Sequence, residues 1–490
     1  MVINGTPLEK EIKKIFETKD VFKRSYFYAT IHTEVDDIPV FKLISFDLVR
    51  DPEENYTDYV RAEILLPLGV LSRKVYPFKQ NLEFSLIKRA VGDPKAGSEE
   101  SKIINEEQKV LYRFKMMYDE RTAPMIRGSD AERMDQFSMD NSAQVKLSIQ
   151  LFDRNAEPLR IKTIGGVFQN FFMEDFLRSA ISQVTNKIKV DGKPILDVVD
   201  LDTRRLNKDK IADIVIPHGT HVYDLPGILQ NKGPGMYSSG CSNYFCNYKG
   251  KSTWFIYPTY HTQRFKDDLY KIIFYILPNG MNLLEKTYRI EGRTIYAVVT
   301  GGSLYSEDGE TGYMARGVGV RMSDARSFMK KPIIMTEEGP VAKRNRLNHE
   351  VGQKDRADNL NYGPVTQQRI TLNPLKEFSE VMKRKGASFG LTWENSEFTH
   401  LYPGMPCKVV YLEEEEIKET YGVILRSHTH IRMMGDSVTS QNHAVNTMVQ
   451  VFTEKLEDIQ MKKRKDNYVK DNNYATILHD QLPKGNKNKL

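Results

Sequence analysis

The sequence has few cysteines and no long apolar run. Only three cysteines occur in 490 residues, and Cys407 is far from Cys241 and Cys246, so the chain lacks the disulfide framework of small secreted proteins. We therefore expect synthesis in a reducing cytoplasm. Because no apolar run of about eighteen residues occurs and the opening residues are polar, the sequence predicts neither a membrane span nor a cleavable export signal.

Two common catalytic motifs are also missing. Residues 250–253 read Gly-Lys-Ser-Thr, like the end of a phosphate-binding loop, but Phe245 stands where the spacing requires a glycine. The residues that follow predict a strand rather than the helix that such a loop precedes. No Gly-x-Ser-x-Gly segment occurs, which excludes the usual nucleophile elbow of a hydrolase. We expect no catalytic residue and no cofactor.

The net charge of +6 is concentrated at one end of the chain. Residues 461–490 carry eight basic and three acidic side chains, so the rest of the chain is nearly neutral. A basic tail can contact nucleic acid or an acidic protein surface. A lysine-rich terminus is more often a solvated arm, and we favour that interpretation.

The clearest pattern lies at residues 401–452. Met405, Cys407, Val409 and Tyr411 recur at period 2, an acidic turn follows at residues 413–416, and a second apolar run continues toward residue 431. This pattern predicts a β-hairpin. Alternation returns from residue 445 to residue 451, which predicts a third strand and hence the wall of a sheet or barrel.

Strand-like runs recur in two further blocks, with a mixed region between them. Four runs between residues 26 and 91 predict a small barrel or strongly bent sheet, and four more lie between residues 252 and 302. Between these blocks, residues 170–188 predict an amphipathic helix with Met173 and Ile181 on one face. The polar stretch at 302–367 predicts a long loop that is ordered by a partner.

His428 and His430 are weak candidates for metal ligands. They stand two apart on a predicted strand, so both imidazoles project from the same face and could bind zinc or iron. His443 or His400 could supply a third ligand. Since nothing in the sequence fixes that third ligand, we favour the polar face of a strand and predict no resident metal.

Aromatic and basic side chains are interleaved at Trp254, Tyr257, Tyr260, Arg264 and Phe265. Such a set can stack on bases or sugars. Burial in a sheet, or contact with another subunit, explains it better, because the set lies near the start of a strand-rich block and aromatic residues and arginine are enriched in interface cores. We favour burial or subunit contact and treat these five residues as interface candidates.

Four stretches together resemble the central baseplate hub proteins of contractile-tailed bacteriophages. They are residues 30–69, 252–265, 286–296 and 402–432. The resemblance implies two small tube-forming barrels in one chain, with peripheral domains between them. It further implies that three chains form a torus of six similar barrels, which matches a six-fold tail tube on one side to a three-fold spike on the other.

The resemblance and the strand pattern together predict an α+β fold dominated by strands, with two small tube-forming β-barrel domains, peripheral mixed domains and long loops. The expected borders are a first barrel at 1–95, a peripheral mixed α/β domain at 96–200, a second strand-rich domain at 201–300, a long polar insertion at 301–368, a second barrel at 369–460 and a basic tail at 461–490.

The expected function is that of a structural virion protein in the tail baseplate. Its expected partners are two further copies of the chain, the spike protein, a tail tube or tube-initiator protein and other baseplate proteins, with no membrane. The genome would pass through the lumen without specific binding. Two alternatives remain, namely a receptor- or glycan-binding baseplate module that uses Trp254 and Tyr257, and a metal-dependent hydrolase that uses His428 and His430.

Overall fold

The computed structural model forms two units, Met1–Glu307 with Asn373–Thr453 and Asp308–Leu372 with Glu454–Leu490. It describes residues 6–16, 24–91, 108–117, 144–268, 270–278, 287–305, 319–324, 341–345, 348–352, 367–371, 373, 375–376, 379, 382–383, 386–413, 416–434 and 443–454. The predicted basic tail at 461–490 lies outside these residues.

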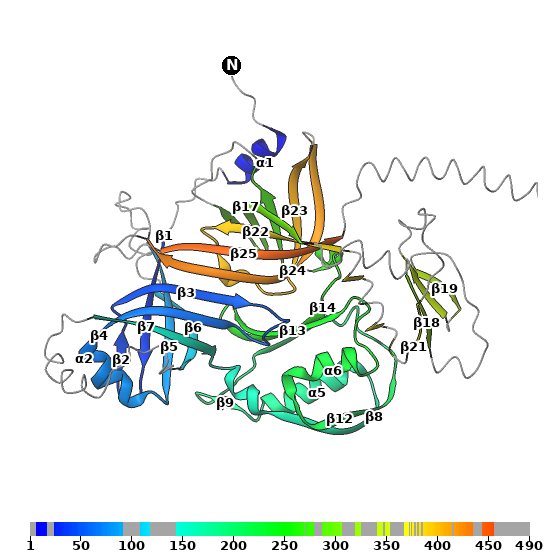
Figure 1. The fold of residues 1–490 in the computed structure, drawn as a ribbon, viewed down its shortest axis with the longest axis horizontal. Helices are drawn as coiled ribbons and strands as arrows, with labels where there is room; N and C mark the ends of the chain where they lie inside the picture. The colour runs from blue at the N-terminus through cyan, green and yellow to red at the C-terminus, as the bar shows by residue number, and fades with distance from the viewer. Residues whose placement is uncertain are drawn as a thin grey trace, which may run out of the picture. The chain divides into compact units, whose positions relative to one another are not determined.

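Six strands of the first unit curve around one apolar core (Figure 1). In sheet order they are β1 (Arg24–His32), β5 (Leu82–Val91), β6 (Gln108–Met117), β7 (Gln144–Asp153), β4 (Tyr59–Pro67) and β3 (Lys42–Arg50), and the short β2 (Asp37–Pro39) also pairs with β1. Fully buried residues alternate with less buried ones along β4, as a strand with one face on a core requires. Among the described pairings none joins β1 to β3, so this barrel-like set keeps an open seam.

A second set of six strands closes on itself. In ring order they are β24 (Glu416–Met433), β23 (Pro406–Glu413), β15 (Lys271–Ile276), β17 (Thr294–Tyr305), β22 (Gly386–Glu394) and β25 (His443–Glu454), which pairs back with β24. Its interior holds large apolar side chains such as Phe274 and Trp393. The hairpin predicted around residues 413–416 is confirmed, since β23 and β24 pair antiparallel up to Glu413 and Glu416.

Strand β24 belongs to both sets. Its first half pairs with β23 of the closed barrel, whereas residues Ser427 to Arg432 pair with β3. The strand is 18 residues long, and β25 runs beside most of it (Figure 1). The two sets are therefore parts of one 14-stranded sheet. Backbone hydrogen bonds, and not loops alone, connect them.

A smaller mixed region contains the predicted amphipathic helix, which is confirmed as α5 (Met173–Thr185) with Leu177 and Ile181 buried. It shares a core with α6 (Leu225–Asn231) and with two small sheets. The strands of these sheets are β11 (Val198–Leu201), β14 (Lys251–Pro258) and β13 (Cys241–Tyr248) in one, and β8 (Thr163–Phe171) and β12 (Ile211–His221) in the other. A short ribbon, β9 (Lys189–Val190) with β10 (Lys193–Pro194), lies nearby in sequence.

The first helix, α1 (Pro7–Phe16), packs on the outside of the closed barrel. Its buried residues Leu8, Ile12 and Phe16 share a cluster with Ile273 and Val298. Since Ile272 and Phe274 face the barrel interior, their neighbour Ile273 points outward. Thr6 and Glu9 exchange hydrogen bonds at the start of the helix, which is a capping box.

The described residues of the second unit form a four-stranded sheet. Its order is β19 (Val341–Asn345), β20 (Asn348–Gly352), β18 (Gly319–Asp324) and β21 (Gln367–Thr371). Three of these strands lie entirely within the range 301–368, which the sequence predicts as a polar insertion, and β21 crosses its end.

The predicted fold class, α+β with strands dominating and two barrel-like sets, is confirmed. Strands β6 and β7 follow residue 95 but belong to the first set, while β15 and β17 precede residue 369 but belong to the closed barrel. The domain borders themselves stay predictions, because sheet pairing does not say which stretches fold independently.

Candidate functional site

The two barrel-like sets meet at a buried arginine, and we call its surroundings the junction: Arg50, Asp58, Tyr112, Asp153, Tyr244 and the segment 398–401. Arg50 ends β3, and its side chain is only 2% exposed. Its Nε and Nη2 donate to the two carboxylate oxygens of Asp58 at 3.0 and 3.1 Å. Its Nη1 donates to the carbonyl oxygens of Leu401 and Phe398 at 2.5 and 3.4 Å. One guanidinium thus binds β3 to the loop before β23.

Two tyrosines complete this network. Arg50 Nη2 also donates to the Tyr112 hydroxyl on β6 at 3.1 Å, and the Tyr244 hydroxyl on β13 donates to Asp58 at 2.9 Å. Burial acts to lower the pKa of Arg50, but the negative charge of Asp58 outweighs it and raises that pKa well above its ordinary value. Arg50 therefore stays charged, and its network joins the first strand set, the closed barrel and the mixed region.

Asp153 lies beside this pair, at the end of β7, and is 4% exposed. Its Oδ1 accepts the backbone N–H groups of Asn155 and Ala156 at 2.9 and 3.0 Å. Burial first, and then the charge of Asp58, raise the pKa of Asp153 to about 7. This carboxyl group changes its charge near neutral pH inside the junction.

A second ion pair, which is partly buried, joins β5 of the first set to the segment between β22 and β23 of the closed barrel. Lys88 on β5 binds Glu397, and the Tyr288 hydroxyl donates to the same carboxylate at 3.2 Å. Burial acts to raise the pKa of Glu397, but the charge of Lys88 and the hydrogen bonds lower it overall. Glu397 thus stays ionised, and it links Lys88 on β5 to Tyr288 on β16 (Tyr288–Glu291), two strands that form no backbone pair with each other.

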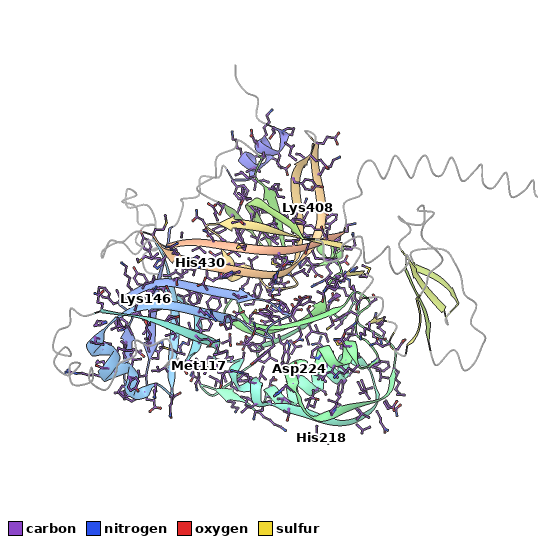
Figure 2. All side chains as sticks on the ribbon, in the orientation of Figure 1. Met117, Lys146, His218, Asp224, Lys408 and His430 are labelled. Atoms are coloured by element: carbon purple, nitrogen blue, oxygen red, sulfur yellow. The ribbon has the colours of Figure 1, made fainter. Side chains whose placement is uncertain are left out.

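The histidine candidates are divided between two places. His430, labelled in Figure 2, binds Asp47 on β3, and His428 Nε2 lies 3.4 Å from the same Asp47 oxygen. His443 instead approaches the Leu43 carbonyl oxygen at 3.1 Å and meets the Phe27 ring edge-on at 5.8 Å. Within the described ranges no group of three His, Cys, Asp or Glu side chains is arranged to hold a metal ion.

Asp47 is the residue of this cluster that sequence reasoning missed. Burial acts to raise its pKa, but the hydrogen bonds and charges of His428 and His430 lower it overall. Asp47 is 383 positions from His430 in the sequence, so no local spacing could connect them. The strand pattern of residues 42–50 could place Asp47 on the outer face, but not opposite His430.

The five interface candidates lie mostly inside the chain. Trp254 is 1% exposed, Tyr257 3%, Arg264 6% and Phe265 9%. The Nη2 of Arg264 lies 2.8 Å from Asp268, and its Nη1 donates to the Gly404 carbonyl oxygen at 2.8 Å. These four side chains support the fold from within, and Trp254 and Tyr257 offer no open faces for a sugar ring.

Tyr260 is the interface candidate with more surface. Its ring lies 4.9 Å from that of Phe452, and it is partly exposed. Contact between this set of five and another subunit stays a prediction.

No helix in the described part of the chain is both long and apolar enough to cross a membrane. No protein-family model matches the sequence, and no curated protein matches it significantly.

Several solved structures are similar in fold. A tail protein from Neisseria meningitidis MC58 is 8% identical, with a TM-score of 0.46 over 87% of this chain and 96% of that one. The 43 kDa tail protein of prophage MuSo2 from Shewanella oneidensis is 11% identical, with a TM-score of 0.42 over 86% and 98%. A type VI secretion component of Escherichia coli, itself similar to tail proteins of bacteriophage T4, is 8% identical, with a TM-score of 0.39 over 87% and 77%.

Two of these neighbours are tail proteins and one is a secretion-system component. Tail proteins are the class that the sequence resembles. Every TM-score is below 0.5 and every identity is 11% or lower. We therefore argue function from the strands and contacts of this chain.

Proposed function

We propose that the chain is a structural tail protein, the trimeric central hub of a contractile-tail baseplate, which adapts a six-fold tail tube to a three-fold spike. The observation that carries this proposal is the pair of six-stranded sets in one polypeptide. Three copies of such a chain present six similar strand sets around one axis. Threefold symmetry on one face can then meet sixfold symmetry on the other.

The connection between the sets suits this role. An adaptor that transmits force needs its two barrels fixed relative to each other, and β24 provides backbone hydrogen bonds to both. The buried ion pair Arg50–Asp58 and the partly buried pair Lys88–Glu397 add side-chain links between the two sets. Closing one set into a ring also removes free strand edges, which would otherwise pair with other chains.

The proposed partners follow from this position in a tail. Two further copies of the chain, a spike protein, a tail tube or tube-initiator protein and other baseplate proteins would surround it in the virion. The genome would pass through the lumen without specific binding. The role needs no turnover, and we propose none.

The proposal is tested by mass in solution, for the full chain alone and mixed with the spike protein of the same tail. We expect three times the chain mass alone and a larger, stoichiometric complex with the spike. A trimeric protein from an unrelated virion serves as the control and should not bind. A chain that stays monomeric at micromolar concentration and does not bind the spike protein would contradict the proposed role as a hub.

A further inference from the structure

One face of the shared sheet is open to solvent and carries cations. Along β24 the residues Ser427, Thr429 and Ile431 are buried and alternate with outward-pointing ones. Among the latter, the side chains of Arg426 and His428 are 53% and 48% exposed. We define the cationic strip as the outward-pointing basic residues of β24 together with one basic residue each of β4 and β7, namely Arg426, His428, His430, Arg432, Arg61 and Lys146.

Strand pairing places the members of the strip on the same side of the sheet. His430 lies opposite Asp47 on β3, and Asp47 lies opposite Arg61 on β4, so these three side chains project from one face. Leu65 of β4 points the same way as Arg61 and lies opposite Lys146 on β7. His430 and Lys146 are both labelled in Figure 2. The strip thus runs from β24, which both sets share, onto the first set.

The charges of this face favour an anion. The carboxylates beside the strip already have partners, which are His428 and His430 for Asp47, Lys146 for Glu63 and Arg426 for Asp51. Arg61 and Arg432 have no carboxylate partner among the described residues, and Arg61 Nε donates to the Tyr59 hydroxyl at 2.7 Å. A guanidinium presents two parallel N–H donors that match the oxygens of a phosphate. Two such groups are therefore available on this face.

The dimensions of the strip fit a linear polyanion. Six residues of one strand separate Arg426 from Arg432, a length of about 20 Å, and Arg61 lies two strands, about 10 Å, from β24. About 20 Å of duplex DNA presents about six phosphates on each of its strands. Within the described side chains of β3, β4, β24 and β25, Met448 is the one large apolar residue that is exposed. A protein partner would favour a more apolar or aromatic centre.

Another wall of the closed barrel has the opposite chemistry. There α1 covers apolar side chains of β15, β17 and β23, among them Ile273, Val298 and Val410. The strip lies instead on a polar wall that is exposed to solvent. Because β24 pairs with strands of both sets, this wall continues from one set to the other.

We propose that the cationic strip binds the phosphate backbone of duplex DNA without reading the base sequence. Arg61 and Arg432 donate to phosphate oxygens, and contacts to the backbone alone carry no direct sequence information. In the proposed hub, the genome that passes through the lumen is the DNA that meets this wall. The inference rests on the proposed function and names the surface of the chain that the genome contacts.

The test measures binding of a short, labelled duplex DNA to the full-length protein by fluorescence anisotropy at several salt concentrations. We expect Arg61→Gln with Arg432→Gln to weaken binding by about tenfold or more. The same variant should lower the slope of log K against log[salt] by at least about two, because each chain loses two phosphate contacts. Two unrelated DNA sequences should show the same loss. Lys210→Gln with Lys232→Gln, two exposed lysines elsewhere, is the matched control and should keep the wild-type slope.

A conservative variant separates charge from packing. Arg61→Lys with Arg432→Lys keeps both positive charges, so its slope should equal that of wild type. A slope that falls as far in the lysine variant as in the glutamine variant would show that the substitutions act through the fold, and it would overturn the strip.

The basic tail is a second possible source of DNA binding, and its charges are removed in a further variant, Lys462→Gln, Lys463→Gln, Arg464→Gln and Lys465→Gln. DNA binding that these changes abolish and that the strip variant leaves intact would overturn the strip. Polyglutamate that binds wild type as tightly as DNA does, and that loses affinity in the strip variant, would identify an acidic protein as the occupant and overturn the assignment to DNA.

The outcomes also separate this inference from the hub. A trimer that binds the spike protein but whose DNA binding does not depend on the strip overturns the strip and leaves the proposed function intact. A chain that stays monomeric, and whose DNA binding shows the expected slopes, supports the strip and overturns the trimer.

Discussion

Arg50 is the residue that most directly holds the two strand sets together. Replacing it by alanine leaves Asp58 as an unpaired charge at a position with 0% side-chain exposure, so we expect Arg50→Ala to lower the free energy of unfolding by roughly 3–5 kcal/mol. Denaturant unfolding of the purified chain measures this loss. Arg61→Ala is the control, because Arg61 is exposed and should contribute less than about 1 kcal/mol. Equal effects of the two substitutions would contradict the role of the junction.

Asp153 makes the stability of the junction depend on pH. Its pKa is raised from 3.8 to about 7 in the folded chain, so ionisation opposes folding. The free energy of unfolding is therefore greatest at low pH, where Asp153 is protonated in both the folded and the unfolded chain. It falls as the pH rises from 3.8 to about 7. The loss is at most about 4 kcal/mol.

Asp153→Asn removes this loss. We expect the variant to be more stable than wild type at pH 8 and much closer to it at pH 5, as measured by urea unfolding at both values. Asp213→Asn, at an exposed carboxyl group on β12, should follow wild type at both. An Asp153→Asn variant whose difference from wild type is the same at pH 5 and pH 8 would refute the buried ionisation.

Single residues were the least predictable part of this chain. The sequence was consistent with Trp254 and Tyr257 lying either in a core or on a contact surface, because aromatic side chains occur in both. The structure buries both residues. The sequence did not indicate that Arg50 is buried, since a charged residue at the end of a strand is usually exposed to solvent. Its partners Asp58 and Leu401 lie 8 and 351 positions away from it in the sequence.

At the scale of elements, β24 packs closely against β25 at Gly422. A Cβ at this position would lie 2.6 Å from the Phe452 carbonyl oxygen and 2.8 Å from Val451 Cγ1, so the two strands would have to separate. We expect Gly422→Ala to cost about 1–3 kcal/mol of stability, measured by thermal or denaturant unfolding. Gly227→Ala, in α6 with no atom within 4 Å of the added carbon, should be neutral or stabilising by up to about 1 kcal/mol. A neutral Gly422→Ala would mean that the strands are not this close.

Helices and strands whose apolar residues recur at a regular spacing were predictable from the sequence. The distant strands with which they pair were not. Alternation alone identified the β23–β24 hairpin, and the spacing of Met173, Leu177 and Ile181 identified α5. The pairing of β24 with β3 joins residues far apart in the sequence. Such pairings depend on how whole cores fit together, which a local pattern does not contain.

At the scale of the molecule, the resemblance predicted two barrels as separate blocks, whereas the chain interleaves them. The first set takes strands from both sides of the segment 118–143, and the closed barrel combines β15 and β17 with strands after residue 385. This interleaving makes the two sets one sheet. In the proposed trimer this interleaving would make the ring stiff, because the spacing of the two sets is fixed within each chain.

Electron cryomicroscopy of the isolated oligomer tests the central claim most directly. Three chains should enclose one lumen, with six strand-rich densities around it at nearly equal angles, two from each chain. A ring in which only the closed barrels surround the lumen, or an assembly without threefold symmetry, would contradict the account.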